Sequence, residues 1–159
     1  MGEGSDGVVH KCIKKKTGRH YAAKAIMFED EHVPLLRYNF MLMKGLSHKN
    51  IVNYEALYLD LKKHSCWLVM EFCPLPNLLG RTISSETELR DIVQQLLETL
   101  HYLHQRSVTH RDIKPENILY DAASKKFKLI DFGICRKFKR RGCRIDMLTI
   151  TGTLYYRAP

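Results

Sequence analysis

Two short groups of polar residues lie on either side of a predicted hairpin, and they limit more than any other feature what this chain can fold into. The first group is His110-Arg111-Asp112-Ile113-Lys114-Pro115-Glu116-Asn117, and the second is Asp131-Phe132-Gly133. The apolar segments 118–120 and 127–130 between them flank a polar turn, which predicts two short antiparallel strands. Two carboxylates and an amide, placed on a loop and at the end of a hairpin, suit divalent metal ions held against phosphate oxygens.

The first third of the chain predicts strands and one helix. Segments 7–13 and 20–26 lie on either side of Thr17-Gly18, a typical turn pair, and predict a β-hairpin. Pro34 can open a helix at its first position. The pattern continues at steps of three and four residues and places Asn39 on the inward face of that helix, among apolar residues. The residues of this pattern are Leu35, Asn39, Leu42, Met43 and Leu46.

The middle of the chain predicts a second strand pair and a long helix. Segments 51–61 and 66–72 are the predicted strands, and the prolines of Pro74-Leu75-Pro76 break the chain after them. Ser85-Glu86-Thr87-Glu88 has the spacing of a capping box and predicts the start of an amphipathic helix that ends near Arg106. Its apolar positions are Leu89, Ile92, Val93, Leu96, Leu97, Leu100 and Leu103.

The composition is that of a folded globular protein. The chain has 159 residues, of which 45% are hydrophobic and 27% charged, and this balance excludes disordered, collagen-like and disulfide-scaffold chains. Twenty-six Lys and Arg residues against 17 Asp and Glu give a net charge of +9. An anionic partner is therefore expected, and charge alone leaves a nucleotide, a phosphorylated segment, nucleic acid and a membrane surface open.

The cysteines and the N-terminal residues indicate a cytoplasmic or nuclear location. Five cysteines are odd in number and have no zinc-site spacing, so we expect free thiols in a reducing compartment. They are Cys12, Cys66, Cys73, Cys135 and Cys143. No stretch approaches 18 apolar residues, and residues 1–7 lack the apolar core of a secretory signal.

The two polar groups together resemble the catalytic loop and the metal-binding Asp-Phe-Gly motif of protein kinases. Upstream, Gly2-Glu3-Gly4-Ser5-Asp6-Gly7-Val8-Val9 resembles the glycine-rich loop of that family, and Tyr21-Ala22-Ala23-Lys24 resembles its lysine strand. Downstream, Gly152-Thr153-Leu154-Tyr155-Tyr156-Arg157-Ala158-Pro159 resembles the end of its activation segment. The resemblance covers essentially the whole chain.

The resemblance implies an α+β, two-lobe kinase-like fold. Residues 1–72 would form the N-lobe, a β-sheet with one αC-type helix, and residues 73–159 part of the helical C-lobe. The family domain is larger and continues past Ala-Pro-Glu into several helices. We therefore expect a fragment whose isolated form is unstable or prone to aggregation, because residues such as Leu89 and Leu96 would lack packing partners.

The resemblance implies ATP-dependent phosphoryl transfer to serine and threonine hydroxyls of proteins. Asp112 would accept or orient the proton of the substrate hydroxyl, and Lys114 would neutralise charge on the γ-phosphate. Asn117 and Asp131 would hold Mg²⁺. Lys114 together with Thr153 follows the pattern of serine/threonine kinases rather than that of tyrosine kinases.

The resemblance also implies the ATP-binding residues. Lys24 would contact the α- and β-phosphates, Met70 would be the gatekeeper, and backbone groups of Glu71 and Cys73 would meet the adenine ring. The complete set is Gly2, Gly4, Gly7, Val9, Ala22, Lys24, Met70, Glu71, Cys73 and Leu119.

One departure from the family pattern raises an alternative function. Asn39 occupies the position at which the family has a glutamate that pairs with the lysine, here Lys24. An amide supplies no charge, so Lys24 would be held less firmly; Glu29 and Glu31 are substitutes in principle. Together with the expected absence of the C-terminal helices, this motivates a pseudokinase-like nucleotide-binding or interaction module.

The predicted activation segment is strongly basic. Six of the nine residues at positions 136–144 are Lys or Arg, which predicts either a solvated loop or a docking site for acidic substrates or a phosphorylated partner. Nucleic-acid binding is disfavoured because aromatic residues are scarce there, and an unrelated basic binding protein is the remaining alternative. The resemblance implies regulation by phosphorylation at Thr149 or Thr151, with Arg111 as the partner of the phosphate.

Overall fold

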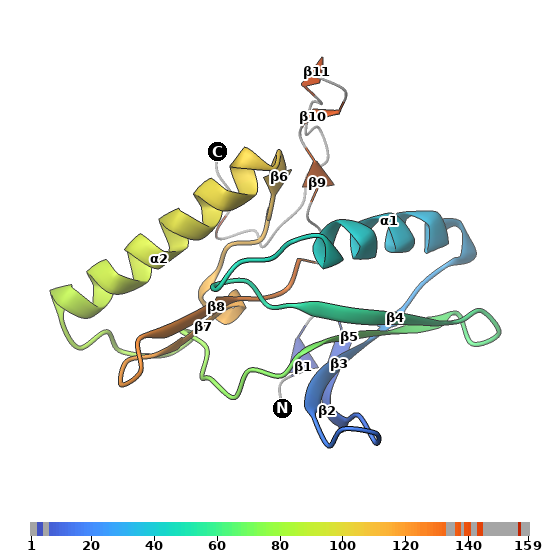
Figure 1. Ribbon diagram of the computed structural model, residues 1–159, viewed down its shortest axis with the longest axis horizontal. Helices are drawn as coiled ribbons and strands as arrows, with labels where there is room; N and C mark the ends of the chain where they lie inside the picture. Colours follow the sequence, from blue (N-terminus) through green and yellow to red (C-terminus); the bar gives the residue numbers. More distant parts are fainter. Residues whose placement is uncertain are drawn as a thin grey trace. The chain divides into compact units, whose positions relative to one another are not determined.

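The computed structural model describes residues 3–4, 7–132, 136–137, 139–140, 143–144 and 156 (Figure 1). The chain divides into two compact units. The first unit contains Met1–Ser47 and Val52–Pro74, and the second contains His48–Ile51 and Leu75–Pro159. The chain thus leaves the first unit for four residues between a helix and a strand, and then returns to it.

The first unit is built on an antiparallel sheet of five strands. In chain order these are β1 (Glu3–Gly4), β2 (Gly7–Ile13), β3 (His20–Met27), β4 (Tyr54–Asp60) and β5 (Ser65–Glu71). They lie in the order β1-β2-β3-β5-β4. The predicted β2–β3 hairpin is confirmed, and Gly18 in its turn has φ +67°, a conformation that glycine adopts without steric cost.

The first strand of the second predicted pair begins later than the sequence indicated. β4 starts at Tyr54, whereas the apolar run starts at Ile51. Ile51 is fully buried and forms an isolated parallel bridge with Leu129, and the Leu129 N–H donates to the Asn50 carbonyl (2.8 Å). The apolar residue at position 51 therefore reflects burial within the second unit and not membership of β4.

The predicted helix of the first unit is present, and its buried face is the predicted one except at Leu35. A single 3₁₀ turn, η1 (Asp30–His32), leads into α1 (Val33–Lys44), which lies along β4 (Figure 1). Pro34 is its second residue, where a missing N–H costs no hydrogen bond. Met43 is 3% exposed, but Leu35 is 42% exposed, so the placement of Leu35 on the inward face was wrong. The other predicted inward positions are confirmed, because Leu46 is 5% exposed and Asn39 and Leu42 are half-buried. Leu36 and Phe40 are half-buried as well.

The second unit contains the long predicted helix, α2 (Glu86–Gln105). Its start is confirmed, because the Ser85 side chain accepts a hydrogen bond from the Glu88 N–H (3.1 Å). The second bond of a capping box would join the Glu88 carboxylate to the Ser85 N–H. Here the Glu88 carboxylate instead accepts from the Ser84 N–H (2.8 Å) and pairs with Arg81 (2.7 Å). Within the described part of the chain, no helix is long and apolar enough to cross a membrane.

Part of the apolar stripe of α2 faces solvent. Ile92 and Leu103 are buried, while Leu89, Val93 and Leu97 are 49%, 42% and 60% exposed. These three residues follow one another at steps of four and form one line along the helix. The predicted amphipathic pattern is therefore correct, but only one side of its apolar stripe packs against described residues.

Short strands surround the polar groups of the second unit. The predicted hairpin is confirmed as β7 (Ile118–Asp121) and β8 (Lys126–Leu129), preceded by the 3₁₀ turn η2 (Pro115–Asn117). Strand β6 (Val108–Thr109) pairs with β9 (Arg136–Lys137), and β10 (Lys139–Arg140) pairs with β11 (Cys143–Arg144). The sequence indicated no strands in the basic segment, because two-residue ladders leave no periodic pattern.

Several hydrogen bonds hold residues 48–51 in the second unit. Asn50 is 3% exposed; its side-chain amide donates to the Gln95 carbonyl (3.4 Å), and its N–H donates to Nδ1 of His48 (3.2 Å). Lys128 Nζ donates to the Ile51 carbonyl (3.1 Å). Polar groups of a buried segment need such partners, because unpaired buried ones are costly.

A neutral histidine lies in the core of the second unit. His110 is 1% exposed; its Nε2 donates to the Ile130 carbonyl (3.0 Å), and its Nδ1 accepts from the Asp112 N–H (3.2 Å). Its ring meets that of Phe132 edge-on, with the centroids 4.4 Å apart. Because a carbonyl can only accept and an N–H can only donate, this pattern requires the Nε2–H tautomer.

We expect Arg81→Met to lower the free energy of unfolding by about 3 kcal/mol, because it leaves the Glu88 carboxylate buried without its ion partner. Arg81 also donates to the Tyr120 carbonyl (2.9 Å). Arg90→Met is the matched control, since Arg90 pairs with Glu86 (2.9 Å) at side-chain exposures of 75% and 84%. It should cost less than about 0.5 kcal/mol. Urea denaturation followed by circular dichroism measures both, and equal effects would contradict the prediction.

We expect the free energy of unfolding to fall as the pH drops below about 6.5. Burial lowers the pKa of His110 from 6.5 in the folded protein. Just below pH 6.5 the unfolded chain therefore binds a proton at His110 that the folded chain does not bind. This stabilisation is complete above the unfolded pKa and is lost toward the lower folded pKa, at up to about 1.4 kcal/mol per pH unit.

Urea denaturation across this pH range tests the prediction for His110. The pKa of His48 is also lowered, chiefly by burial, so His48→Gln is the variant that separates the two histidines. The fall should persist in His48→Gln. A free energy of unfolding that stays constant in this variant would refute the role of His110.

Candidate active site

The structure brings together three of the residues that were predicted from the first polar group. Asp112, Lys114 and Asn117 lie between β6 and β7, and their side chains are largely buried. Lys114 Nζ is 3.0 Å from Oδ2 of Asp112. The Asn117 amide donates to the same Oδ2 (3.0 Å) and to the Asp112 carbonyl (2.8 Å). One carboxylate oxygen is thus held by a cation and an amide at once, which fixes its position.

The donor set at the end of the hairpin fits a magnesium ion. Both hydrogens of the Asn117 amide nitrogen are engaged by Asp112, so the acceptor that this side chain offers is Oδ1. The Ile130 N–H donates to the Asn117 carbonyl (3.0 Å), so Asp131 directly follows a residue bonded to Asn117. A carboxylate and an amide oxygen are the hard oxygen ligands that Mg²⁺ prefers.

Two residues beside these side chains adopt left-handed backbone conformations. Arg111 has φ +71° and Asp131 has φ +60°. Such values are uncommon for residues other than glycine, and they persist where the surroundings determine the backbone. His110 supplies such a determinant, because it bonds the backbone on both sides, at Asp112 and at Ile130. No role was predicted for His110; its place at the head of the polar group was the available signal.

The first unit gathers four predicted ATP-binding residues on one face of its sheet. Val9 lies opposite Lys24 in the β2–β3 pair, and Ala22 lies opposite Met70 in the β3–β5 pair. Ala22 and Lys24 are two residues apart on β3 and so point to the same side. Lys24 is 8% exposed and Met70 9%. The face therefore combines one buried cation with apolar neighbours.

The remaining predicted ATP-binding residues lie outside this group of four, and one of them lies outside the described residues. Gly4 and Gly7 are opposite each other in the β1–β2 pair. The Glu71 N–H donates to the Asn53 carbonyl (2.8 Å), and the Glu71 carboxylate accepts from the Asn53 amide (3.0 Å). Cys73 follows β5 and is half-buried, and Leu119 lies on β7 of the second unit. Four predicted site residues lie outside the described residues: Gly2, Thr149, Thr151 and Thr153.

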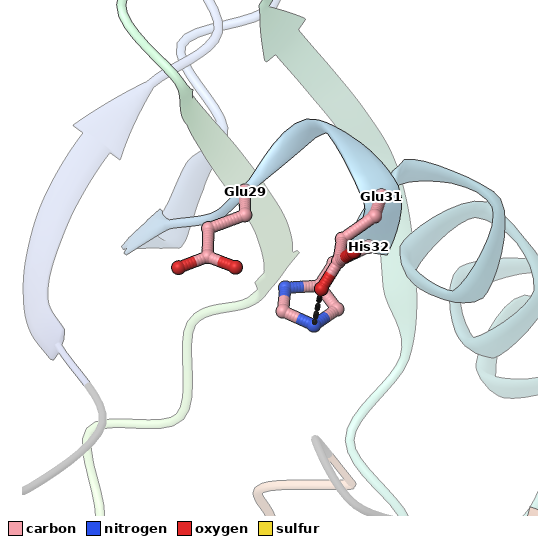
Figure 2. Close-up of side chains that lie close together, drawn as sticks. All are labelled: Glu29, Glu31 and His32. Atoms are coloured by element: carbon pink, nitrogen blue, oxygen red, sulfur yellow. Dashed lines mark ion pairs between the residues drawn. The ribbon is translucent and has the colours of Figure 1, made fainter.

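Asn39 lies on α1 with a buried oxygen. Its Oδ1 has no hydrogen-bond partner among the described residues, so it accepts no bond from Lys24. The two glutamates considered as substitutes, Glu29 and Glu31, are exposed around η1, and Glu31 pairs with His32 (3.7 Å; Figure 2). The interaction expected from the family pattern at this helix position is therefore absent from the described part of the chain.

One group of potential metal ligands lies away from the predicted site. Glu29, Glu31 and His32 each offer a ligand atom, and these atoms lie within 4.8 Å of one another (Figure 2). All three side chains are exposed at the turn that leads into α1. Exposed carboxylates are well hydrated and need no metal ion to be stable. We call Glu29, Glu31 and His32 the acidic turn.

Comparison with known proteins agrees with this geometry. The family model of the protein kinase domain matches residues 1–159. Calcium-dependent protein kinase 5 of Plasmodium falciparum is 33% identical over 100% of this chain and 28% of its own length. Myosin light chain kinase 3 of Homo sapiens is 36% identical over 89% of this chain and 18% of its own length. Calcium/calmodulin-dependent protein kinase type IV of Mus musculus is 32% identical over 100% of this chain and 34% of its own length.

The chain thus spans about a third or less of the length of these relatives. The match to the family model nevertheless extends over the whole sequence, and it includes both polar groups and the lysine strand. The chain belongs to the protein kinase family.

Proposed function

We propose that this chain carries the catalytic apparatus of an ATP-dependent kinase that phosphorylates serine and threonine hydroxyls of proteins. The observation that carries the proposal is the buried network in which Lys114 and Asn117 both hold the Asp112 carboxylate at 3.0 Å. A carboxylate fixed in this way needs no reorganisation to receive a proton or to orient a hydroxyl. Positioning of this kind supplies most of the catalysis in phosphoryl transfer.

Each residue of the network has a separate task in this proposal. Asp112 accepts or orients the proton of the acceptor hydroxyl, and Lys114 neutralises charge on the γ-phosphate. Asn117 and Asp131 would hold Mg²⁺, which when bound supplies charge neutralisation at the phosphate oxygens. His110 keeps the backbone on both sides of the site in place through Asp112 and Ile130.

ATP binding is proposed for the residues that the family pattern implies. In the first unit, the sheet face with Val9, Ala22, Lys24 and Met70 offers apolar surface to adenine and a cation to the phosphates. Because the Glu71 N–H donates to the Asn53 carbonyl, the Glu71 carbonyl is the group that would meet the adenine ring. The remaining proposed ATP contacts are Gly2, Gly4, Gly7, Cys73 and Leu119.

The two units are proposed to correspond to the lobes expected from the family. The first unit ends at Pro74, near the expected boundary between residues 1–72 and 73–159, and its sheet and α1 suit an N-lobe. The second unit, with α2 and the polar loop, suits part of a C-lobe.

Serine/threonine specificity and regulation rest on the family pattern. Lys114 and Thr153 support serine or threonine acceptors, and the basic residues of 136–144 favour acidic protein substrates. Phosphorylation at Thr149 or Thr151 would give Arg111 an anionic partner. These three threonines are proposed from the sequence alone.

Asp112→Asn should lower kcat/KM for phosphoryl transfer to a serine-containing protein by at least about a hundredfold, because an amide cannot take up the proton. Asp121→Asn is the matched control, since Asp121 bonds Ser124 in the β7–β8 turn and belongs to no part of the proposed site. It should leave kcat/KM unchanged. Assays with labelled ATP on the full-length protein measure both. Equal activity of Asp112→Asn and the native protein would remove the proposal.

The second candidate is a pseudokinase-like module that binds nucleotide without efficient catalysis. It is favoured by Asn39, whose buried Oδ1 has no hydrogen-bond partner among residues that the structure describes. Without a charged partner at this helix position, the arrangement of Lys24 required for catalysis is less favoured. This candidate predicts nucleotide binding with activity no higher than that of Asp112→Asn.

Asn39→Glu distinguishes the two candidates. A carboxylate would form a charge-assisted bond with Lys24 where Asn39 forms none, a gain of about 1 kcal/mol, so kcat should rise about fivefold if this position limits catalysis. Asn39→Gln controls for side-chain length, because it adds a methylene without charge, and it should not raise kcat. A native protein with no activity above Asp112→Asn, together with binding of ATP in a thermal-shift assay, would favour the pseudokinase.

A further inference from the structure

Helix α1 is apolar on its outer side as well as on its inner side. Pro34, Tyr38 and Met41 are spaced at i, i+4 and i+7 and line the face opposite Met43. Tyr38 is 49% exposed and Met41 66% exposed. A helix that is apolar all round is normally covered on all sides. The outer side of α1 therefore has the composition of an interface.

Two cations border this apolar line, and α1 carries no acidic residue. Arg37 and Lys44 are seven residues apart, which places them on the same edge about 10 Å from each other along the helix. Arg37 is exposed and makes no hydrogen bond or ion pair with any described residue. Lys44 donates to the backbone carbonyl of Glu55 (3.2 Å), which leaves its charge without a described counterion. The edge is therefore electrostatically complementary to carboxylates.

The exposed apolar line on α2 has a different border. On α2, Leu89, Val93 and Leu97 are flanked by Glu86 and Glu98, which pair with Arg90 (2.9 Å) and Lys49 (3.4 Å). Its charges are already matched within the described residues. Exposed apolar side chains next to unmatched cations occur together on α1, and this combination selects for an acidic partner.

We propose that the outer face of α1, defined by Pro34, Arg37, Tyr38, Met41 and Lys44, is a docking site for an acidic amphipathic helix of a partner protein. Apolar side chains of that helix would cover Tyr38 and Met41, and two carboxylates seven residues apart would face Arg37 and Lys44. Burial of an aromatic and a methionine at the centre with charges at the rim is the usual anatomy of a protein interface.

The acidic turn before α1 predicts the orientation of the bound helix. Glu29 and Glu31 lie at the N-terminal end of the helix (Figure 2), and Lys44 lies at its C-terminal end. Carboxylates of the partner would be repelled at the first end and attracted at the second. The acidic end of the bound helix should therefore lie beside Lys44.

The test uses a fluorescein-labelled synthetic helix of about 18 residues, with leucines on one face and glutamates seven residues apart along its edge. A matched peptide carries lysines at the glutamate positions. Fluorescence anisotropy with the full chain should show binding of the acidic peptide, and Met41→Ser or Tyr38→Ser should weaken it at least about tenfold. Arg37→Glu should weaken the acidic peptide and strengthen the basic one. Circular dichroism checks that each exposed-site variant is folded.

Leu97→Ser is the matched control, because Leu97 is 60% exposed on α2, close to the 66% of Met41. It should leave the affinity for the acidic peptide unchanged. Absence of binding, equal affinity for both peptides, or equal losses in Leu97→Ser and Met41→Ser would overturn the proposal.

Two further measurements identify a different occupant. Sedimentation velocity that shows a dimer abolished by Met41→Ser would assign this face to a second copy of the chain. Binding to phosphatidylserine vesicles that is lost in Met41→Ser, without binding of the acidic peptide, would assign it to a membrane surface. Either result would overturn the docking of an acidic helix.

Discussion

The side-chain amide of Asn117 determines the shape of the polar loop on which the site depends. It donates both of its hydrogens to Asp112, one to the carbonyl and one to the carboxylate, and Lys114 neutralises the same carboxylate. A carboxylate at 8% exposure is stable only when it is paired and hydrogen-bonded. The groups that perform the proposed chemistry therefore also fix the conformation of the loop. The same hydrogen-bonded network serves both stability and the proposed function.

His110 and the segment 48–51 hold that network in place within the second unit. His110 bonds Asp112 on one side and Ile130 on the other, so it offsets the cost of the left-handed backbone at Arg111 and Asp131. The segment 48–51 lies against the hairpin, where its Asn50 carbonyl accepts from Leu129. Because this segment lies between α1 and β4 in the chain, the second unit includes residues that chain order would assign to the first.

Most local structure could be predicted, because hairpins and amphipathic helices depend on short periodic patterns. The β2–β3 and β7–β8 hairpins and the start of α2 are confirmed, and the family match confirms the expected kinase-like fold class. The predictions went wrong where burial came from distant residues. Ile51 is buried because it bridges Leu129 and not because it belongs to β4. Leu35 is 42% exposed, although the other predicted inward residues of α1 are buried or half-buried.

The sequence by itself determined the residues on which the proposed chemistry depends, because residue types at close spacing define a donor set before any folding is known. Asp112, Asn117 and Asp131 were predicted in this way, and Lys114 was predicted from the family resemblance. Only the tertiary structure decided that Asp112 takes both amide hydrogens of Asn117 and that Oδ1 of Asn39 lacks a described partner. Hydrogen-bond partners join residues that are separated along the chain, so packing and not local pattern selects them.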